Sequence, residues 1–358
     1  ANSVWVDQDG LHLTGRNVGG QWRSTEVVLE EALGYGTYMF KTTSRQDILD
    51  ANVTFGAFTW DVFGDDSRIP AWPNREIDFE DSRWGNPSDS TNSQVVVQPY
   101  WVNGNLERYS LPDLSGDDST LTRFFTWAPG RVEFYTLLGD HDPADFPQSA
   151  IINHTVMTES LPNNIIPEPG RENFRFNLWL NQGAPAGADP IEVVVSDFAY
   201  TGLGDFDFDG DYACADVDVL VAEIASGAHG LEFDLDGDGL VNGADLSEWL
   251  ALAGEAEFGE GQAYLPGDAN LDGAVDGQDF VGWNSHKFTS TASWCNGDFN
   301  ADGLVDGQDF VIWNNNKFSS IGDAVAVPEP VVNLPVLLII MTAASRHLRR
   351  TARPARQV

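Results

Sequence analysis

Hydrophobic and polar residues alternate in short runs along residues 1–201, and turn-forming Gly, Pro, Asn and Asp separate the runs. Alternation with a period of two is typical of strands with one buried face. Helical periodicity is nearly absent from this part. The clearest runs are GTYMFKTTS, NVTFGAFTW, SQVVVQPY, RVEFYTLLG, NFRFNLWL and IEVVVSDFAY. We therefore predict an all-β antiparallel sandwich for residues 1–202, large enough to bury a sizeable core.

After residue 202 the pattern changes to a repeat. Four twelve-residue segments align, and each precedes an apolar, helix-like run: DFDFDGDYACAD, DLDGDGLVNGAD, DANLDGAVDGQD and DFNADGLVDGQD. The stretch GEAEFGEGQAYLPG separates the second copy from the third and is typical of a linker. We predict two small helical modules at residues 203–252 and 266–320, a linker at residues 253–265, and a tail of different composition at residues 321–358.

The net charge limits the kinds of ligand that the protein is expected to bind. The formal net charge is −36, and such a surface repels nucleic acid phosphates but attracts cations. From Leu203 to Val325 the chain has 25 Asp and Glu, two Lys and no Arg. The repeat region therefore has a chemistry of its own, and cation binding is its natural function.

Oxygen-bearing side chains recur at fixed positions in the four repeats. Positions 1, 3, 5 and 12 hold Asp or Asn and position 6 holds Gly, which is the spacing of a loop that wraps oxygen ligands around Ca²⁺. The predicted ligands are Asp205, Asp207, Asp209 and Asp216; Asp234, Asp236, Asp238 and Asp245; Asp268, Asn270, Asp272 and Asp279; Asp298, Asn300, Asp302 and Asp309. Position 9 adds Asn242, Asp276 and Asp306, but it is Ala213 in the first repeat. We expect up to four Ca²⁺ ions, the first bound most weakly; solvated turns are the alternative.

A loop followed by one helix, with Asp at position 12, resembles the dockerin repeat more than the full EF-hand. The resemblance implies an adaptor function, in which the modules dock the protein onto a cohesin-like or envelope partner. The segments GQDFVGWNSHKF and GQDFVIWNNNKF do not show the pattern of a Ser/Thr pair with basic residues that cohesin-binding dockerins use for recognition. The nature of the partner therefore stays open.

The stretch NREIDFED places three carboxylates at every second position of a predicted strand. Glu76, Asp78 and Glu80 share one face, whereas Ile77 and Phe79 share the opposite, apolar face. The acidic face lies either in solvent or in a cleft. Like charges along a strand repel one another, so the arrangement makes sense if one group holds a proton near neutral pH. Two carboxyl groups about 5 Å apart are the apparatus of retaining glycosidases.

Residues 15–201 resemble glycoside hydrolase family 16, a group of concanavalin-like jelly rolls. NREIDFED is similar to the active-site strand of that family, GAFTW to the strand before it, and FTWAPGRVEFYTLLGD, NFRFNLWLNQG and EVVVSDFAYTG to later strands. The resemblance implies an all-β jelly-roll sandwich and an endo-acting, retaining hydrolase of a β-linked polysaccharide such as a β-glucan or galactan. It makes Glu76 the nucleophile and Glu80 the acid/base. Asp78, ionised and hydrogen-bonded to Glu76, would tune both.

Tryptophans are candidates for stacking on the pyranose faces of such a substrate. Those nearest the motif are Trp60, Trp72, Trp84 and Trp101, each with a structural role in the core or rim as the alternative. Trp127 and Trp179 lie in strand-like runs, and we expect both in the core. Arg75 and Arg83 flank the motif and either offset its charge or form surface ion pairs.

The C-terminal tail has three parts: VPEP, the apolar run VVNLPVLLIIMTAAS, and the Arg-rich end RHLRRTARPARQV. Together they resemble the PEP-CTERM sorting signal of bacterial envelope proteins, which implies transient membrane contact and then cleavage. A weak C-terminal anchor is the alternative. Either reading predicts an extracellular or cell-envelope location, where Cys214 and Cys295 can form a disulfide.

Three hypotheses for function follow. The first is a secreted or surface-attached glycoside hydrolase with calcium-binding dockerin-like modules. The second is a non-catalytic, lectin-like sandwich that binds glycans. The third is a scaffold or adaptor that works through its repeats.

Overall fold

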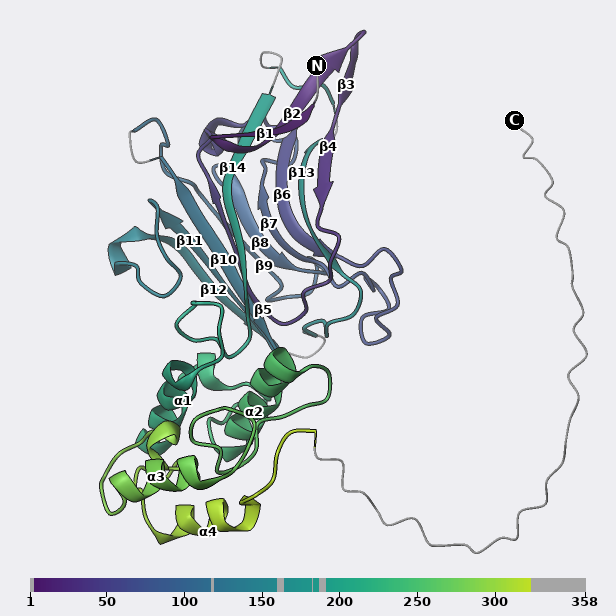
Figure 1. Cartoon of the computed structure of the whole chain (residues 1–358). Coiled ribbons are helices and arrows are strands. Elements are labelled where there is room, and N and C mark those ends of the chain that lie inside the picture. The colour runs from purple at the N-terminus through teal and green to yellow at the C-terminus, as the bar shows by residue number, and fades with distance from the viewer. Residues whose placement is uncertain (1–2, 117–118, 160–163, 182, 187–190, 323–358) are drawn as a thin grey trace, which may run out of the picture. The chain divides into compact units, whose positions relative to one another are not determined.

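The computed structural model describes residues 3–116, 119–159, 164–181, 183–186 and 191–322 (Figure 1). All of them belong to one compact unit. The predicted sorting signal falls, from residue 323 on, outside the described residues. No helix in the described ranges has both the length and the apolar character needed to cross a membrane.

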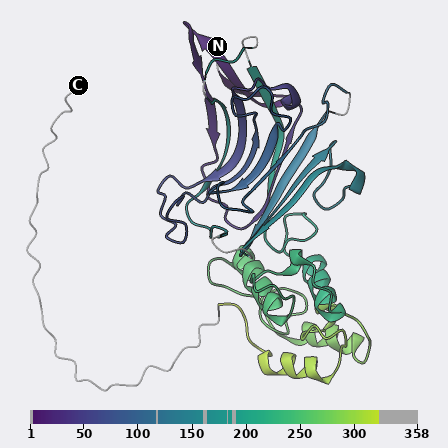
Figure 2. The same cartoon turned by 180° about the vertical axis from the view of Figure 1, so that it is seen from behind.

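The first part of the chain forms two antiparallel sheets, seen from opposite sides in Figures 1 and 2. One sheet has the order β1-β2-β14-β5-β10-β11-β12, with β3 paired to β2, and the other has the order β4-β13-β6-β7-β8-β9. The strands of the first sheet are β1 (Val4–Asp7), β2 (Gly10–Val18), β3 (Gln21–Arg23), β5 (Gly36–Thr42), β10 (Leu121–Ala128), β11 (Arg131–Leu138), β12 (Ile151–Thr158) and β14 (Ile191–Gly202). Those of the second are β4 (Thr25–Val28), β6 (Val53–Trp60), β7 (Ile77–Asp81), β8 (Ser93–Val97), β9 (Leu106–Tyr109) and β13 (Asn173–Leu180). This sandwich confirms the predicted all-β architecture and fits a jelly roll.

The hydrophobic core lies between the two sheets and consists largely of aromatic rings. Ile77 and Phe79 of β7 are completely buried in it. The ring of Phe79 meets Phe40 edge-on at 5.5 Å and Phe134 at 5.4 Å, so it contacts side chains of the facing sheet. Because side chains alternate along a strand, burial of these two residues turns the even-numbered positions of β7 to the outer face.

A buried ion pair links the same strand to the other sheet. The guanidinium of Arg123 on β10 donates two hydrogen bonds, of 2.9 and 3.0 Å, to the carboxylate of Asp81 at the end of β7. Neither side chain is exposed to solvent. Ser93 Oγ donates a third hydrogen bond of 2.8 Å to Asp81. The end of the predicted active-site strand is thereby held by charge as well as by packing.

The second part of the chain is helical. Its helices are α1 (Cys214–Ser226), α2 (Gly243–Phe258), α3 (Gly277–His286) and α4 (Gly307–Asn316), and short 3-10 turns are η1 (Gln46–Ile48), η2 (Gln148–Ala150), η3 (Leu231–Phe233) and η4 (Trp294–Asn296). Position 9 of each repeat is the residue before the helix. Asn242, Asp276 and Asp306 accept a hydrogen bond from the second following backbone N–H and cap α2, α3 and α4. Ala213 cannot provide such a cap for α1.

The two predicted modules share one core. Buried residues of both, including Val217, Trp249, Trp283 and Trp294, belong to a single hydrophobic cluster. Cys214 at the start of α1 and Cys295 in η4 form a disulfide with a Cα–Cα distance of 5.9 Å. Repeats one and two are therefore joined to repeats three and four by packing and by a covalent bond. The predicted module boundaries stay a prediction.

Candidate active site

The three predicted carboxylates lie together on the outer face of β7. Asp78 and Glu80 alternate with the buried Ile77 and Phe79, and Glu76 directly precedes the strand. Two adjoining hollows of about 340 and 530 Å³ lie over this face, and Glu76 and Glu80 line both. The acidic face is thus the floor of an open cleft.

Neighbouring strands shape the floor. β6 runs beside β7 with Gly56 opposite Glu80, and β8 runs on its other side with Gln94 opposite Glu80. A Cβ at Gly56 would lie 2.7 Å from Asn177 Oδ1, so a larger residue here would have to displace the side chain of Asn177. The absence of a side chain at Gly56 leaves the space beside Glu80 open.

Each carboxylate receives a hydrogen bond from a different neutral donor. Trp72 Nε1 donates to Glu76 Oε2. Gln98 Nε2 donates to Asp78 Oδ2 over 3.2 Å, and Gln94 Nε2 donates to Glu80 Oε2 over 2.6 Å.

Two hydrogen bonds to the side-chain oxygen of Gln94 fix the orientation of its amide group. Gln94 Oε1 accepts hydrogen bonds from Trp84 Nε1 at 3.0 Å and from Arg108 Nη1 at 2.6 Å. With its oxygen engaged by two N–H donors, the amide must present its NH₂ group to Glu80. The positive charge of Arg108 therefore acts on Glu80 through the amide of Gln94 as well as through space.

The environment raises the pKa of all three carboxyl groups. Burial raises the pKa of Glu76 to about 7 and that of Glu80 to about 7, although the bonds from Trp72 and Gln94 act in the opposite direction. Asp78 is only 2% exposed; burial, and then the charges of its two neighbours, hold its pKa well above the usual range.

A hydrogen bond between Asp78 and Glu76 raises the pKa of the former and lowers that of the latter, so Asp78 is the donor. These directions favour a protonated Asp78, whereas the expectation from the sequence is an ionised one. As the donor, Asp78 favours the charged form of Glu76.

The arrangement suits a displacement by two carboxyl groups. Glu76 accepts two hydrogen bonds that favour its ionised form, whereas Glu80 lies beside an ionised neighbour and is partly desolvated. Such an arrangement is typical of sites in which one carboxyl group attacks and the other donates a proton near neutral pH.

The predicted tryptophans lie around the cleft. Trp60 lines the smaller hollow, and Trp72 and Trp84 line the larger one. Trp101 lines neither hollow, but its ring meets Trp72 at 5.6 Å and is 55% exposed. Trp101 is thus placed to extend the aromatic surface beyond the hollows.

The two tryptophans expected in the core, Trp127 and Trp179, differ in burial. Trp127 is completely buried, as predicted. Trp179 is not in the core, because it shares a face of β13 with Arg175 and Asn177 and alternates with the buried Leu178. It lines both hollows, and its ring meets Trp84 at 5.9 Å.

The arginines that flank the motif face away from it. Arg75 has a positive φ of 53° and bonds to Asp61 and Asp65 at 2.6 Å. Arg83 donates to backbone carbonyls of Asp47 and Leu49. Neither offsets the charge of the carboxylates.

The sequence analysis missed the polar residues that share the cleft with the carboxylates. These are Glu26, Gln94, Gln98, Tyr100, Arg108, Arg175 and Asn177. A signal existed for the two glutamines, because they alternate with Val95 and Val97 of the core. No local signal marks Arg108.

The four repeats fold into loops of one design. In each, the acid at position 12 accepts hydrogen bonds from the backbone N–H groups of positions 2, 3 and 9. The acid at position 1 accepts one from the Gly at position 6. These four interior pairs are Asp205 and Asp216, Asp234 and Asp245, Asp268 and Asp279, and Asp298 and Asp309.

In the first two repeats the acid at position 3 lies close to this interior pair, and in repeats two to four the side chain at position 9 caps the following helix. Carboxylate oxygens of Asp205, Asp207 and Asp216 lie within 4.8 Å of one another, as do those of Asp234, Asp236 and Asp245. The position-9 side chains Asn242, Asp276 and Asp306 are engaged as helix caps. The exposed acids at position 5 each accept a backbone bond from position 7: Asp209, Asp238, Asp272 and Asp302.

The donor set fits a hard divalent cation. Asp205 Oδ1 is buried and has no hydrogen-bond partner in the described part of the chain. Burial raises the pKa of Asp268 and of Asp298 to about 7, which shows carboxylates without a compensating positive charge. Oxygen atoms grouped in this way are the ligands that Ca²⁺ prefers.

No protein-family model and no curated protein matches the sequence. Among solved structures, the chain is similar to a prokaryotic β-1,3-1,4-glucanase (lichenase) derived from a mouse hindgut metagenome, with 17% identity over 55% of this chain and 82% of that chain and a TM-score of 0.37. It is also similar to a family 16 glycosyl hydrolase from Mycobacterium smegmatis, with 18% identity over 55% and 77% of the two chains and a TM-score of 0.37. A β-1,3-glucanase from Mycobacterium marinum has 20% identity over 52% and 71%, with a TM-score of 0.35.

Proposed function

We propose that the protein is a retaining glycoside hydrolase that cleaves a β-linked polysaccharide inside the chain. The observation that carries the proposal is the floor of the cleft, where Glu76, Asp78 and Glu80 face open space with pKa values shifted upward. A strand that merely faced water would leave its carboxylates solvated. Buried carboxyl groups that line a cleft are instead typical of acid/base sites.

In the proposed reaction Glu76 attacks the anomeric carbon while Glu80 protonates the leaving oxygen, and the glycosidic C–O bond breaks. The product is a glycosyl ester on Glu76. Glu80, now ionised, then removes a proton from water, which attacks the same carbon and releases Glu76. Asp78 stays protonated and positions Glu76 through their shared hydrogen bond.

The walls of the cleft suit a sugar chain. Tryptophans flank the carboxylates in both hollows, with Trp60 in one and Trp72 and Trp84 in the other. Aromatic faces stack on the apolar CH faces of pyranoses. Binding on both sides of the carboxylates supports internal cleavage of a β-glucan or galactan.

The repeats are proposed to bind up to four Ca²⁺ ions through the predicted ligand sets. The ion would neutralise the interior acids at positions 1, 3 and 12 and so stabilise the loops. The first repeat lacks a side-chain oxygen at Ala213 and is the weakest site. We propose a location outside the cytoplasm, where Ca²⁺ is plentiful, with a cohesin-like or envelope partner for the repeats.

Reducing-sugar release from a panel of β-glucans and galactans tests the proposal, with wild type compared to Glu76→Gln. We expect release by the wild type and its loss in the variant, without a change in melting temperature. Glycan binding by a wild type that cleaves nothing would favour the lectin-like alternative. Neither binding nor cleavage would favour the scaffold alternative.

A further inference from the structure

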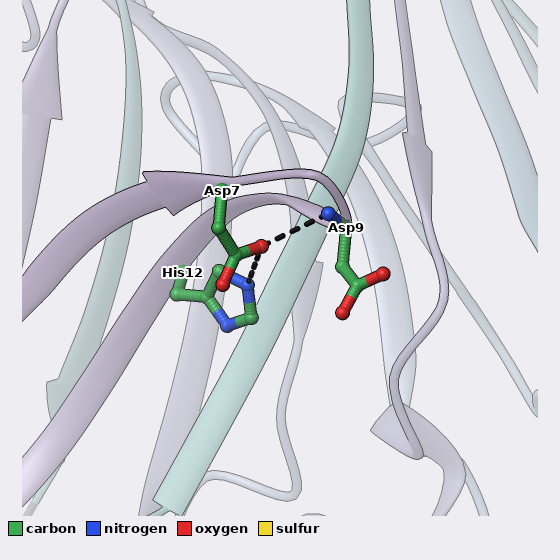
Figure 3. A group of neighbouring side chains, drawn as sticks. All are labelled: Asp7, Asp9 and His12. Carbon is green, nitrogen blue, oxygen red and sulfur yellow. Dashed lines mark hydrogen bonds and ion pairs between the residues drawn. The ribbon is translucent and has the colours of Figure 1, made fainter.

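A second cluster of charged side chains lies on the first sheet, at the hairpin between β1 and β2 (Figure 3). It contains Asp7, Asp9 and His12, each of which offers one ligand atom within 4.8 Å of those of the other two. His12 is only 8% exposed, whereas both aspartates are exposed. The cluster belongs neither to the cleft nor to the calcium repeats.

The fold places His12 at the centre of three strands. It pairs with Trp5 of β1 on one side and with Val194 of β14 on the other. The indole of Trp5 stacks on the imidazole at 4.6 Å and covers one of its faces. Gly10 makes the approach to β14 possible, because a Cβ there would lie 2.2 Å from Val195 O. The ring of His12 thus has a fixed orientation.

Both ring nitrogens of His12 face carboxylates. Nδ1 lies 3.0 Å from Glu192 Oε1 on β14, and Nε2 lies 3.0 Å from Asp7 Oδ1. If Nδ1–H donates to Glu192, the lone pair of Nε2 points at an oxygen that is itself an acceptor. Only a positive charge between Nε2 and Asp7, either a proton or a metal ion, makes that contact favourable.

We propose that this cluster is a binding site for a divalent transition metal ion of the Zn²⁺ class, with His12 Nε2, Asp7 and Asp9 as ligands. One nitrogen and two carboxylates suit zinc better than calcium, which takes oxygen ligands. Donors on tetrahedral zinc with bonds of about 2.0–2.1 Å are about 3.3 Å apart, close to the spacing of Nε2 and Asp7 Oδ1. The exposed side of the cluster leaves room for a water ligand.

Glu192 supplies the supporting interaction that such sites use. A ligating histidine usually donates its other N–H to a carboxylate, which sets the tautomer and strengthens the metal bond. Glu192 comes from β14, far from the hairpin in sequence, and its contact with Nδ1 directs Nε2 toward Asp7.

The charge balance also favours a cation. In the part of the chain that the structure describes, the ion pairs of Asp7 and Glu192 are those to His12, and no ion pair involves Asp9. Arg16 is near, but its Nε donates to Thr14 and its guanidinium lies over Trp5 at 5.6 Å. Three carboxylates therefore surround one imidazole. A bound ion would join the β1–β2 hairpin to β14.

Asp9 offers the cleanest test, because its hydrogen bond to Asp7 comes from the backbone. The backbone N–H of Asp9 donates to Asp7 over 2.9 Å, and a change of side chain leaves this donor in place. Asp9→Asn should leave the hairpin intact. His154 provides a matched control: its Nε2 lies 2.7 Å from Glu133, and its ring stacks on Tyr135 at 4.2 Å. His154 faces a single carboxylate, that of Glu133. The other oxygen of Glu133 forms an ion pair with Arg131.

The experiment is Zn²⁺ titration of the full chain in excess Ca²⁺, followed by calorimetry and by competition with a chromogenic zinc chelator. We expect one equivalent of Zn²⁺ in the wild type and in His154→Gln. Its affinity should fall at least about tenfold in Asp9→Asn, about 10–100-fold in Glu192→Gln, and be lost in His12→Gln. Co²⁺ in place of Zn²⁺ should give visible absorption bands that disappear in the same variants.

Equal Zn²⁺ affinity in the wild type, Asp9→Asn and His12→Gln would overturn the proposal. The proposal would also be overturned if the wild type bound no more Zn²⁺ than His12→Gln does, because a proton alone would then bridge His12 and Asp7. Circular dichroism of each variant identifies any that fails to fold, and Asp9→Asn with Co²⁺ then decides.

Discussion

Replacing Glu80 with Gln should stabilise the protein above neutral pH and change its stability little at pH 4. Burial, opposed by the bond from Gln94, raises the pKa of Glu80 from 4.5 to about 7. A carboxyl that holds its proton more tightly in the folded chain contributes stability fully below about pH 4.5, and this contribution is lost as the pH rises through about 7. Glutamine does not titrate, so the variant has no such loss.

The magnitude follows from the two pKa values. A carboxyl whose pKa rises from 4.5 to about 7 disfavours the folded state by up to about 3 kcal/mol once it is ionised. Glu80 faces the open cleft, and water screens part of this cost, so we expect about 1–2 kcal/mol. For a domain of this size that corresponds to a rise in Tm of about 2–8 °C. The amide of Gln at position 80 still accepts the hydrogen bond from Gln94.

The assay is thermal unfolding of the full chain, followed by tryptophan fluorescence in excess Ca²⁺ between pH 4 and pH 9. The difference in Tm between Glu80→Gln and wild type should grow from near zero at pH 4 to a plateau above pH 8. Glu107→Gln, at an exposed position of the nearby strand β9, is the control and should show no such growth. A difference that is constant with pH, or a variant less stable than wild type at pH 8, would refute the reasoning.

Three further predictions concern the acid, the buried ion pair and the repeats. Gln94→Met removes a bond that favours ionised Glu80, so the alkaline limb of the pH–rate profile should move up by about one pH unit; an unchanged limb would show that the amide does not tune the acid. Arg123→Met should cost about 3–5 kcal/mol in urea unfolding because Asp81 is left buried and unpaired, and the double variant with Asp81→Leu should recover much of it. Chelation of Ca²⁺ should lower the helical circular dichroism of the full chain, and added Mg²⁺ should restore it less well than Ca²⁺; a signal indifferent to chelator would contradict the calcium proposal.

The strand that carries the carboxylates was predictable because its pattern is unambiguous. Strict alternation around Ile77 and Phe79 defines which face is buried, and the opposite face then carries all three acids. The same rule applied to β13 would have placed Trp179 beside Arg175 in the cleft. A strand-like run alone predicts a core position for Trp179, but a strand has two faces and the alternation assigns this residue to the outer one.

Local alternation assigns the two glutamines to the outer face, but it does not predict which carboxylate each of them meets. Gln94 reaches Glu80 only because β8 pairs with β7 in one particular register, and a shift of one residue would turn it to the core. Arg108 reaches Gln94 from a further strand. Register depends on the packing of the whole sheet, whereas the repeat loops are local, so their spacing alone predicts that Asp205, Asp207 and Asp216 come together. The role of position 9 as a helix cap was not predicted.

The polar network around β7 explains how three carboxylates coexist on one strand face. Their direct donors are an indole and two amides, from Trp72, Gln98 and Gln94, and none of these carries a charge. Neutral donors orient a carboxylate without cancelling its charge, so protons must relieve the repulsion. Burial and the charges of its neighbours favour a protonated Asp78. Burial raises the pKa of Glu76 and of Glu80 to about 7, and the bond from Asp78 favours a charged Glu76. A lysine or arginine in place of either glutamine would lower all three pKa values and leave no acid to protonate a leaving group. The neutral amides therefore maintain the one-charged, one-protonated state that a double displacement requires.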